Sequence, residues 1–175
     1  MISYLTELKE WIHDKKGICI TRVIKTWGSS PRPMGSIMLI NEDGKMLGSV
    51  SGGCVEGDVV KKALNVIKTG ESLGVAYGVS NESAWSFGLS CGGNIQVFLE
   101  KIDYEQNQLW QELVNSLEQN QYAILISSLE DGANKKGLLT EKGKILGDSL
   151  DSELIELARK SYEKRASGKA VHNDL

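Results

Sequence analysis

The chain has 175 residues, of which 41% are hydrophobic and 25% are charged, and its formal net charge is −3. This composition is ordinary for a globular protein with one good core, and the acidic balance argues against a sequence-independent nucleic-acid binder, which needs a basic surface. No stretch approaches the roughly 20 apolar residues that cross a bilayer, and the amino terminus is too acidic for a signal peptide, so we expect a cytoplasmic protein that binds neither nucleic acid nor membranes.

The first predicted elements are a helix and three strands. Apolar residues at spacings of three and four predict an amphipathic helix over residues 3–15. β-Branched and apolar runs predict strands at 18–23, 37–40 and 46–50. The sequence Asn-Glu-Asp-Gly at 41–44 is typical of a hairpin turn, so the last two of these strands should pair.

A second helix and two strands follow. Apolar residues recur every four positions from Val55 to Ile67, which predicts a helix over 55–69 that ends at Gly70. Apolar runs at 73–79 and 95–99 predict two further strands.

The second half of the chain repeats the order of the first. Residues 44–48, Gly-Lys-Met-Leu-Gly, are echoed by Gly-Lys-Ile-Leu-Gly at 143–147. The elements predicted there are a helix at 106–119, a strand at 122–128, a hairpin of 138–140 with 144–146, and a helix at 151–166.

These elements predict the fold class and the domain plan. We expect an α/β protein of the α+β type, in which a mixed β-sheet with hairpins is packed by helices. Residues 1–168 should form one domain with an internal repeat of 1–70 and 105–167, and the polar residues 169–175 should fray.

The loop at 28–35, Gly-Ser-Ser-Pro-Arg-Pro-Met-Gly, is the first candidate for function. It contains both prolines of the chain, so it should be stiff and extended. Ser29 and Ser30 offer hydroxyls, Gly35 permits close backbone approach, and Arg32 offers a planar fork suited to phosphate or carboxylate. The alternative is a strand connection with a solvated arginine.

The second candidate is the segment at 51–56. Gly52 and Gly53 expose backbone amides directly before the predicted helix, where the helix end contributes a partial positive charge. A thiol at Cys54 should therefore be partly ionised and could act as a nucleophile, a sulfur carrier or a soft-metal ligand. The alternative is a small buried thiol at a tight turn.

The third candidate repeats this chemistry as Cys91-Gly92-Gly93. A planar heterocycle could lie against Trp85 or Phe87 while it approaches bare backbone at the glycines. The alternative is a turn before a strand, with the aromatic side chains in the core.

Other classes of site fit the residues less well. Asp58 stands where a nucleotide-binding P-loop needs lysine, no G-x-G-x-x-G occurs, and the thiols lack the pairing of a zinc site. Cys19 lies in an apolar strand and should be a core thiol. The two histidines, His13 and His172, are poorly placed to activate a cysteine, which favours ligation over acyl transfer.

The segments 28–35, 48–56 and 91–93 resemble the motifs of the XdhC/CoxI family, mainly over residues 1–100 and more weakly to about 165. The resemblance implies an accessory protein, more a carrier than an enzyme, that binds molybdenum cofactor (molybdopterin). Such a protein shields the cofactor while a cysteine desulfurase supplies sulfur, delivers it to a xanthine-dehydrogenase-like apoenzyme, and forms a homodimer.

The resemblance also implies roles for individual residues. Cys54 would ligate the molybdenum or contact the dithiolene sulfurs, the two glycine pairs would admit the pterin, and Arg32 with the neighbouring serines would reach the phosphate. The cofactor-binding residues implied are Ser29, Ser30, Arg32, Gly35, Ser51, Gly52, Gly53, Cys54, Glu56, Cys91, Gly92 and Gly93.

Two other functions stay open. The same Cys54 could serve a sulfurtransferase or another thiol enzyme, and the chain could be a non-catalytic interaction module of a molybdoenzyme system. Many family members continue into a carboxy-terminal Rossmann-like domain, whose glycine fingerprint these 175 residues lack. We therefore expect either a short, single-domain member of the family or one half of a two-piece system with a separate Rossmann-domain partner.

Overall fold

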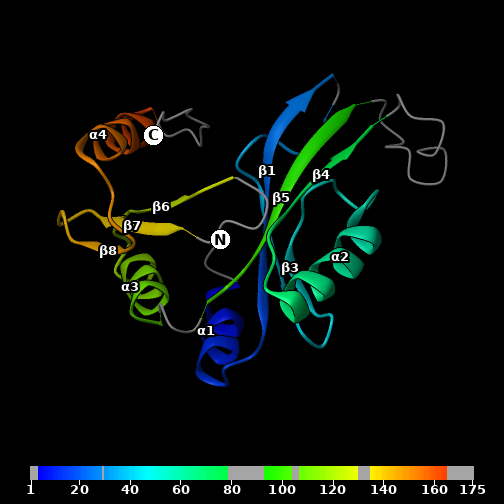
Figure 1. Ribbon diagram of the computed structural model, residues 1–175, viewed down its shortest axis with the longest axis horizontal. Helices are drawn as coiled ribbons and strands as arrows, with labels where there is room; N and C mark the ends of the chain where they lie inside the picture. The colour runs from blue at the N-terminus through cyan, green and yellow to red at the C-terminus, as the bar shows by residue number, and fades with distance from the viewer. Residues whose placement is uncertain (1–3, 29, 79–92, 104–106, 130–134, 165–175) are drawn as a thin grey trace. The chain divides into compact units, whose positions relative to one another are not determined.

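The computed structural model describes residues 4–28, 30–78, 93–103, 107–129 and 135–164 (Figure 1). The chain divides into two compact units, each with its own sheet. A single domain over residues 1–168 therefore stays a prediction. The five-stranded unit comprises Lys16–Ile102 and Leu129–Ala133, and the three-stranded unit comprises Met1–Lys15, Asp103–Ser128 and Asn134–Leu175.

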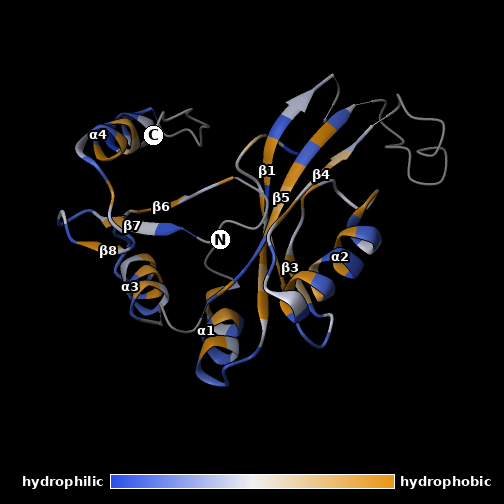
Figure 2. Cartoon of the chain, viewed as in Figure 1, coloured by the Kyte–Doolittle hydropathy of each residue, from blue (hydrophilic) through white to orange (hydrophobic). Residues whose placement is uncertain are grey.

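The five-stranded unit has strand order β3-β2-β1-β5-β4, with every neighbouring pair antiparallel. One helix, α2, packs on a face of this sheet. Hydrophobic and hydrophilic residues alternate along the start of β5, as a strand with two different faces requires (Figure 2). The elements are β1 (Ile18–Trp27), β2 (Ile37–Asn41), β3 (Met46–Gly48), α2 (Glu56–Thr69), β4 (Leu73–Tyr77) and β5 (Asn94–Lys101).

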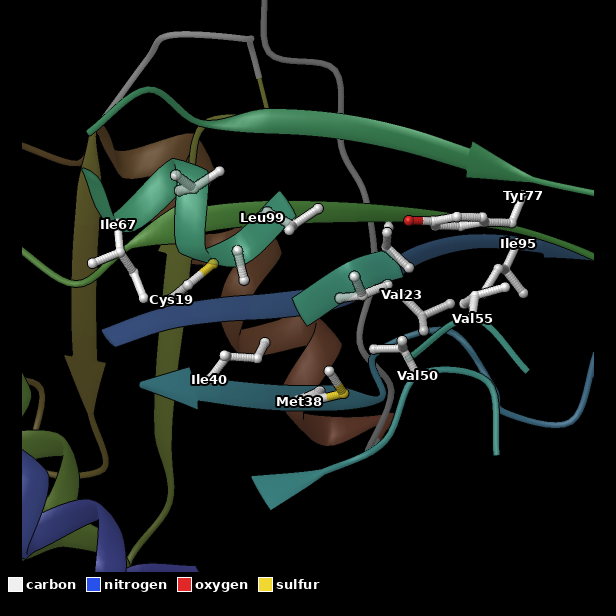
Figure 3. Packing of buried hydrophobic residues seen from close by; sticks show 14 residues of the cluster. Cys19, Val23, Met38, Ile40, Val50, Val55, Ile67, Tyr77, Ile95 and Leu99 are labelled. Carbon is white, nitrogen blue, oxygen red and sulfur yellow. The ribbon is translucent and has the colours of Figure 1, made fainter. Parts of the chain in front are cut away.

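The core of this unit lies between α2 and the sheet (Figure 3). Cys19 and Val23 of β1 and Met38 and Ile40 of β2 are buried there, because alternate residues of a strand point to the same face. The prediction that Cys19 is a core thiol is therefore confirmed. The α2 residues in this core are Val59, Ala63, Val66 and Ile67.

The helix α2 ends where the sequence predicts. Gly70 has φ 80°, the left-handed conformation that glycine adopts at helix ends, and its amide donates to the Val66 carbonyl at 2.8 Å. The start differs by one residue from the prediction, because Val55 is the N-cap and Glu56 begins the helix.

The three-stranded unit has strand order β6-β7-β8, again antiparallel, with three helices. Leu109, Trp110 and Val114 of α3 are buried, and α3 contacts β7. Asp151 caps α4 by accepting a hydrogen bond from the Leu154 amide at 2.8 Å. The elements are α1 (Leu5–His13), α3 (Asn107–Glu118), β6 (Ala123–Ser127), β7 (Lys136–Thr140), β8 (Ile145–Gly147) and α4 (Ser152–Glu163).

The β2-β3 and β7-β8 hairpins have the same internal geometry. The Asn41 side chain accepts a hydrogen bond from the Lys45 amide, and Thr140 accepts the equivalent bond from Lys144. The echo between 44–48 and 143–147 is thus a matched hairpin in both units. The wider repeat of 1–70 and 105–167 stays a prediction that this match supports.

The helices and sheets confirm the predicted α/β class, with hairpins packed by helices. In place of the one mixed sheet expected, the described strands form two sheets, and all their pairings are antiparallel. Among the residues that the structure describes, no helix has the length and apolar character to span a membrane.

Candidate functional site

The loops that carry the sequence motifs leave the five-stranded sheet at one end. β1 ends at Trp27, which pairs with Asn94 at the start of β5, and β4 ends at Tyr77 beside the same part of β5. β3 ends at Gly48, which pairs with Met38 near the start of β2. Antiparallel pairing therefore brings the connections that follow β1, β3 and β4 to the same end of the sheet, where α2 also begins (Figure 1).

Residues 28–36, here called the proline loop, connect β1 to β2. The Ser30 hydroxyl donates to the Arg32 carbonyl at 2.9 Å, and the Gly35 amide donates to the Val23 carbonyl at 2.8 Å. Gly35 has φ 86°, a conformation that favours glycine. The Arg32 side chain is exposed, as expected for a presented loop, and Ser29 lies outside the described residues.

Residues 49–55, here called the Cys54 loop, adjoin the proline loop. A Cβ added at Gly52 would lie 3.7 Å from the Pro31 ring, which is ordinary van der Waals contact. Among the residues that the structure describes, no atom lies within 4 Å of a Cβ built at Gly53. Gly52 therefore faces the proline loop, whereas the outer side of Gly53 is not covered by any described atom.

The Glu56 carboxylate is the centre of the Cys54 loop. Its Oε1 accepts hydrogen bonds from the Ser49 hydroxyl at 2.6 Å and the Ser51 amide at 2.9 Å. Its Oε2 accepts from the Gly53 amide at 2.9 Å and from the Ser51 hydroxyl. The side chain is buried, so the first residue of α2 folds back beneath the loop that precedes it.

Two serine hydroxyls complete this network. Ser51 Oγ accepts from the Cys54 and Val55 amides, both at 3.0 Å, and Ser49 Oγ accepts from the Gly52 amide at 2.8 Å. Five successive amides of the segment therefore donate to side-chain oxygens. Each hydroxyl gives its one proton to Glu56 and accepts with its lone pairs, which is consistent with an ionised carboxylate.

The pKa of Glu56 reflects this network. Burial opposes ionisation, but the hydrogen bonds from Ser49 and Ser51 outweigh it and lower the pKa to about 2. Glu56 therefore carries a full negative charge inside the loop at neutral pH.

Cys54 is half-buried and packs against the core of the five-stranded unit. The sequence led us to expect bare amides and a helix end that would ionise its thiol. The Cys54 and Val55 amides instead donate to Ser51, so these donors are already used. The role of Cys54 as a soft ligand stays a prediction.

The third motif is described only at its end. Gly93 is buried and directly precedes β5, whereas Cys91 and Gly92, together with the aromatic residues before them, lie outside the described residues. The prediction that Cys54 and Cys91 share a site therefore stays a prediction. Within the described part of the chain, no group of three or more His, Cys, Asp and Glu side chains is placed to hold a metal ion.

The sequence did not indicate the interaction of Tyr77 and Lys62 with Asp58 near this end of the sheet. The Tyr77 hydroxyl donates to Asp58 at 2.7 Å, and Lys62 donates to the same carboxylate at 2.6 Å. Burial and this bond raise the pKa of Tyr77, whereas the bonds from Lys62 and Tyr77 outweigh burial and lower the pKa of Asp58. The four-residue spacing of Asp58 and Lys62 is the one part of this arrangement that a sequence indicates, because such residues are neighbours on a helix. The hydrogen bond from Tyr77 joins Asp58 to a strand residue 19 positions later.

The geometry defines a mixed α/β protein in which a hydrogen-bonded glycine loop and the proline loop lie at one end of a sheet. Residues 11–78 match the model of the XdhC and CoxI family, a span that contains both loops. This match confirms the family resemblance predicted from the sequence.

Two curated relatives and one solved structure are similar to the chain. It is 36% identical over 105 residues to the molybdenum cofactor insertion chaperone PaoD of Escherichia coli (strain K12), which covers 59% of this chain and 32% of PaoD. It is 26% identical over 161 residues to a probable xanthine dehydrogenase subunit of Bacillus subtilis (strain 168), covering 91% of this chain and 48% of that protein.

The solved structure is the crystal structure of a xanthine dehydrogenase from Bacillus halodurans. It matches with a TM-score of 0.71 and 26% identity, over 89% of this chain and 48% of that chain. The chain thus spans between about a third and half of the length of these relatives.

Proposed function

We propose that the chain is an accessory protein that binds molybdenum cofactor at the sheet end formed by the Cys54 loop and the proline loop. The observation that carries this proposal is that the family match at residues 11–78 contains both loops, which adjoin each other in the structure. The similarity to a protein named as a molybdenum cofactor insertion chaperone supports the same role.

The residues at this site fit such a cargo. The Cys54 thiol would supply one soft ligand, which suits a metal that already carries dithiolene sulfurs and needs few further ligands. No described atom lies within 4 Å of a Cβ built at Gly53, so a planar pterin would approach the backbone there. Arg32, exposed on the adjoining loop, would bind the phosphate with its guanidinium fork.

The finer steps of this role are also proposals. The protein would hold the cofactor while a cysteine desulfurase replaces an oxo ligand by sulfur, and would then deliver it to a xanthine-dehydrogenase-type apoenzyme. It would act in the cytoplasm as a homodimer, with a separate Rossmann-domain partner where that domain is needed. Ser29, Cys91 and Gly92 would complete the site.

The proposal is tested by the cofactor that the purified protein retains. Produced with a molybdopterin source, the wild type should carry both pterin and molybdenum. Cys54→Ala should lose molybdenum, and Arg32→Ala should lose pterin and molybdenum together, because it removes the phosphate contact. Cys19→Ala, a thiol in the core, and Arg159→Ala, an exposed arginine in α4, are the matched controls.

A wild type without cofactor, under conditions that load an apoenzyme, would contradict the carrier role and leave an interaction module. The sulfurtransferase alternative predicts a different result from the same protein. A desulfurase and cysteine should add one sulfur to Cys54 as a persulfide, which mass spectrometry detects. An unmodified Cys54 would count against that alternative.

A further inference from the structure

The Cys54 loop has the form of an anion site that the protein itself has filled. A glycine-bearing loop before a helix normally points its amides at a phosphate, which the helix end also attracts. Here the Glu56 carboxylate lies where that anion would be. We infer that Glu56 is a specificity-determining residue that closes the Cys54 loop to phosphate and leaves its thiol and glycine backbone as the surface for the cofactor.

The backbone amides of the Cys54 loop already have hydrogen-bond acceptors. The Ser51 and Gly53 amides donate to Glu56, and those of Gly52, Cys54 and Val55 donate to the serine hydroxyls that Glu56 holds in place. A phosphate could reach these amides only by breaking such bonds. A phosphate would therefore find no amide donor in residues 51–55 that Glu56 or a serine hydroxyl does not already occupy.

The charge of Glu56 also opposes phosphate. The buried Glu56 carboxylate accepts four hydrogen bonds from the loop, so both of its oxygens face the loop's donors. A second anion at these amides would lie close to the carboxylate oxygens, and two anionic groups at such a short separation repel each other. The loop is thus selective against phosphate even if a few amides open.

The conformation of the glycines determines which way their amides point. Gly52 and Gly53 have φ values of 78° and 114°, which turn their amides inward toward Ser49 and Glu56. The outer side of the loop consequently presents the glycine α-carbons, and the half-buried Cys54 follows them in the chain. Such a surface suits a planar ring and a soft metal better than a phosphate.

This inference rests on the proposed function, which identifies the ligand of the loop as molybdenum cofactor. It adds the direction in which the cofactor lies at the site. With the Cys54 loop closed to anions, the phosphate end of the cofactor is assigned to the adjoining proline loop and Arg32. The metal end then lies at Cys54. Glu56, expected from the resemblance to contact the cofactor, acts instead through the loop that it shapes.

Inorganic phosphate tests the inference without any cofactor. In the wild type, the amide NMR signals of residues 51–55 should not shift when phosphate replaces chloride at constant ionic strength. Glu56→Ala empties the position, so phosphate should raise its Tm by roughly 5–10 °C at a hundredfold excess over the dissociation constant. Glu71→Ala, which removes an exposed carboxylate, should behave as the wild type.

Saturable phosphate shifts at the amides of 51–55 in the wild type would overturn the inference, and this measurement stands even if Glu56→Ala fails to fold. A folded Glu56→Ala that ignores phosphate would overturn it as well. Neither result depends on molybdenum. A failure here is therefore distinct from a failure of the carrier role, which the retained cofactor measures.

Discussion

At the scale of single residues, the candidate site was only partly visible in the sequence. The segment around Cys54 was found because glycine pairs and a thiol before a helix form a recognisable pattern. The part played by Glu56 was not found, because a glutamate in the first turn of a helix normally interacts with the helix end in solvent. Its burial depends on Ser49 and Ser51 being folded over it, which the residue types alone do not reveal.

The depressed pKa of Glu56 makes the stability of the protein depend on pH in a defined direction. A folded pKa of about 2, below the ordinary value of 4.5, means that the carboxylate stabilises the fold above about pH 4.5 and loses this effect as the pH falls toward 2. The contribution is on the order of 3 kcal/mol, since one pKa unit corresponds to about 1.4 kcal/mol.

Urea unfolding of the wild type and Glu56→Gln across this range measures the effect. The wild type should be the more stable protein at neutral pH, and the difference should narrow below pH 4.5. Glu71→Gln, at an exposed position, is the matched control. A difference that stays constant with pH would show that Glu56 does not act through its charge.

At the scale of helices and strands, the sequence predicted most elements because their periodicities are local. Two boundaries differ for reasons that are not local. β1 continues to Trp27, four residues past its predicted end, because an irregularity between Val23 and Lys25 lets it keep pairing with β5. β3 ends at Gly48 because its φ of 86° turns the chain into the Cys54 loop.

Gly48 is therefore the element boundary that positions the site, and substitution should be costly. A Cβ there would lie 2.4 Å from the Ile37 carbonyl oxygen, in addition to the strained φ, so we expect Gly48→Ala to lower the free energy of unfolding by more than about 3 kcal/mol. Gly44 has φ 78° with open space around it, so Gly44→Ala should cost only about 1 kcal/mol.

Chemical denaturation of the two variants checks this difference. Gly147→Ala and Gly143→Ala offer the same comparison in the other hairpin, where a Cβ at Gly147 would lie 2.4 Å from the Lys136 carbonyl oxygen. Equal losses for Gly48→Ala and Gly44→Ala would mean that φ alone, and not the close approach to β2, determines the cost.

At the scale of the whole chain, the grouping of the motif loops could not be predicted from the sequence. It follows from the strand order β3-β2-β1-β5-β4, in which β1 pairs with a strand more than 60 residues later in the chain. The expectation that these segments share a site came from the family resemblance. For the proline loop and the Cys54 loop, the structure gives a physical reason why they lie together. Both loops leave the same end of the sheet, and they adjoin at Gly52.

The central claim is that this sheet end binds molybdenum cofactor, and direct binding tests it best. Cofactor released from a molybdoenzyme would be mixed with the purified chain, and pterin and molybdenum retained through gel filtration would be measured. The account predicts that the wild type retains both, that Cys54→Ala loses molybdenum, and that Cys19→Ala matches the wild type. Retention by none of these proteins, or equal retention by Cys54→Ala and the wild type, would contradict it.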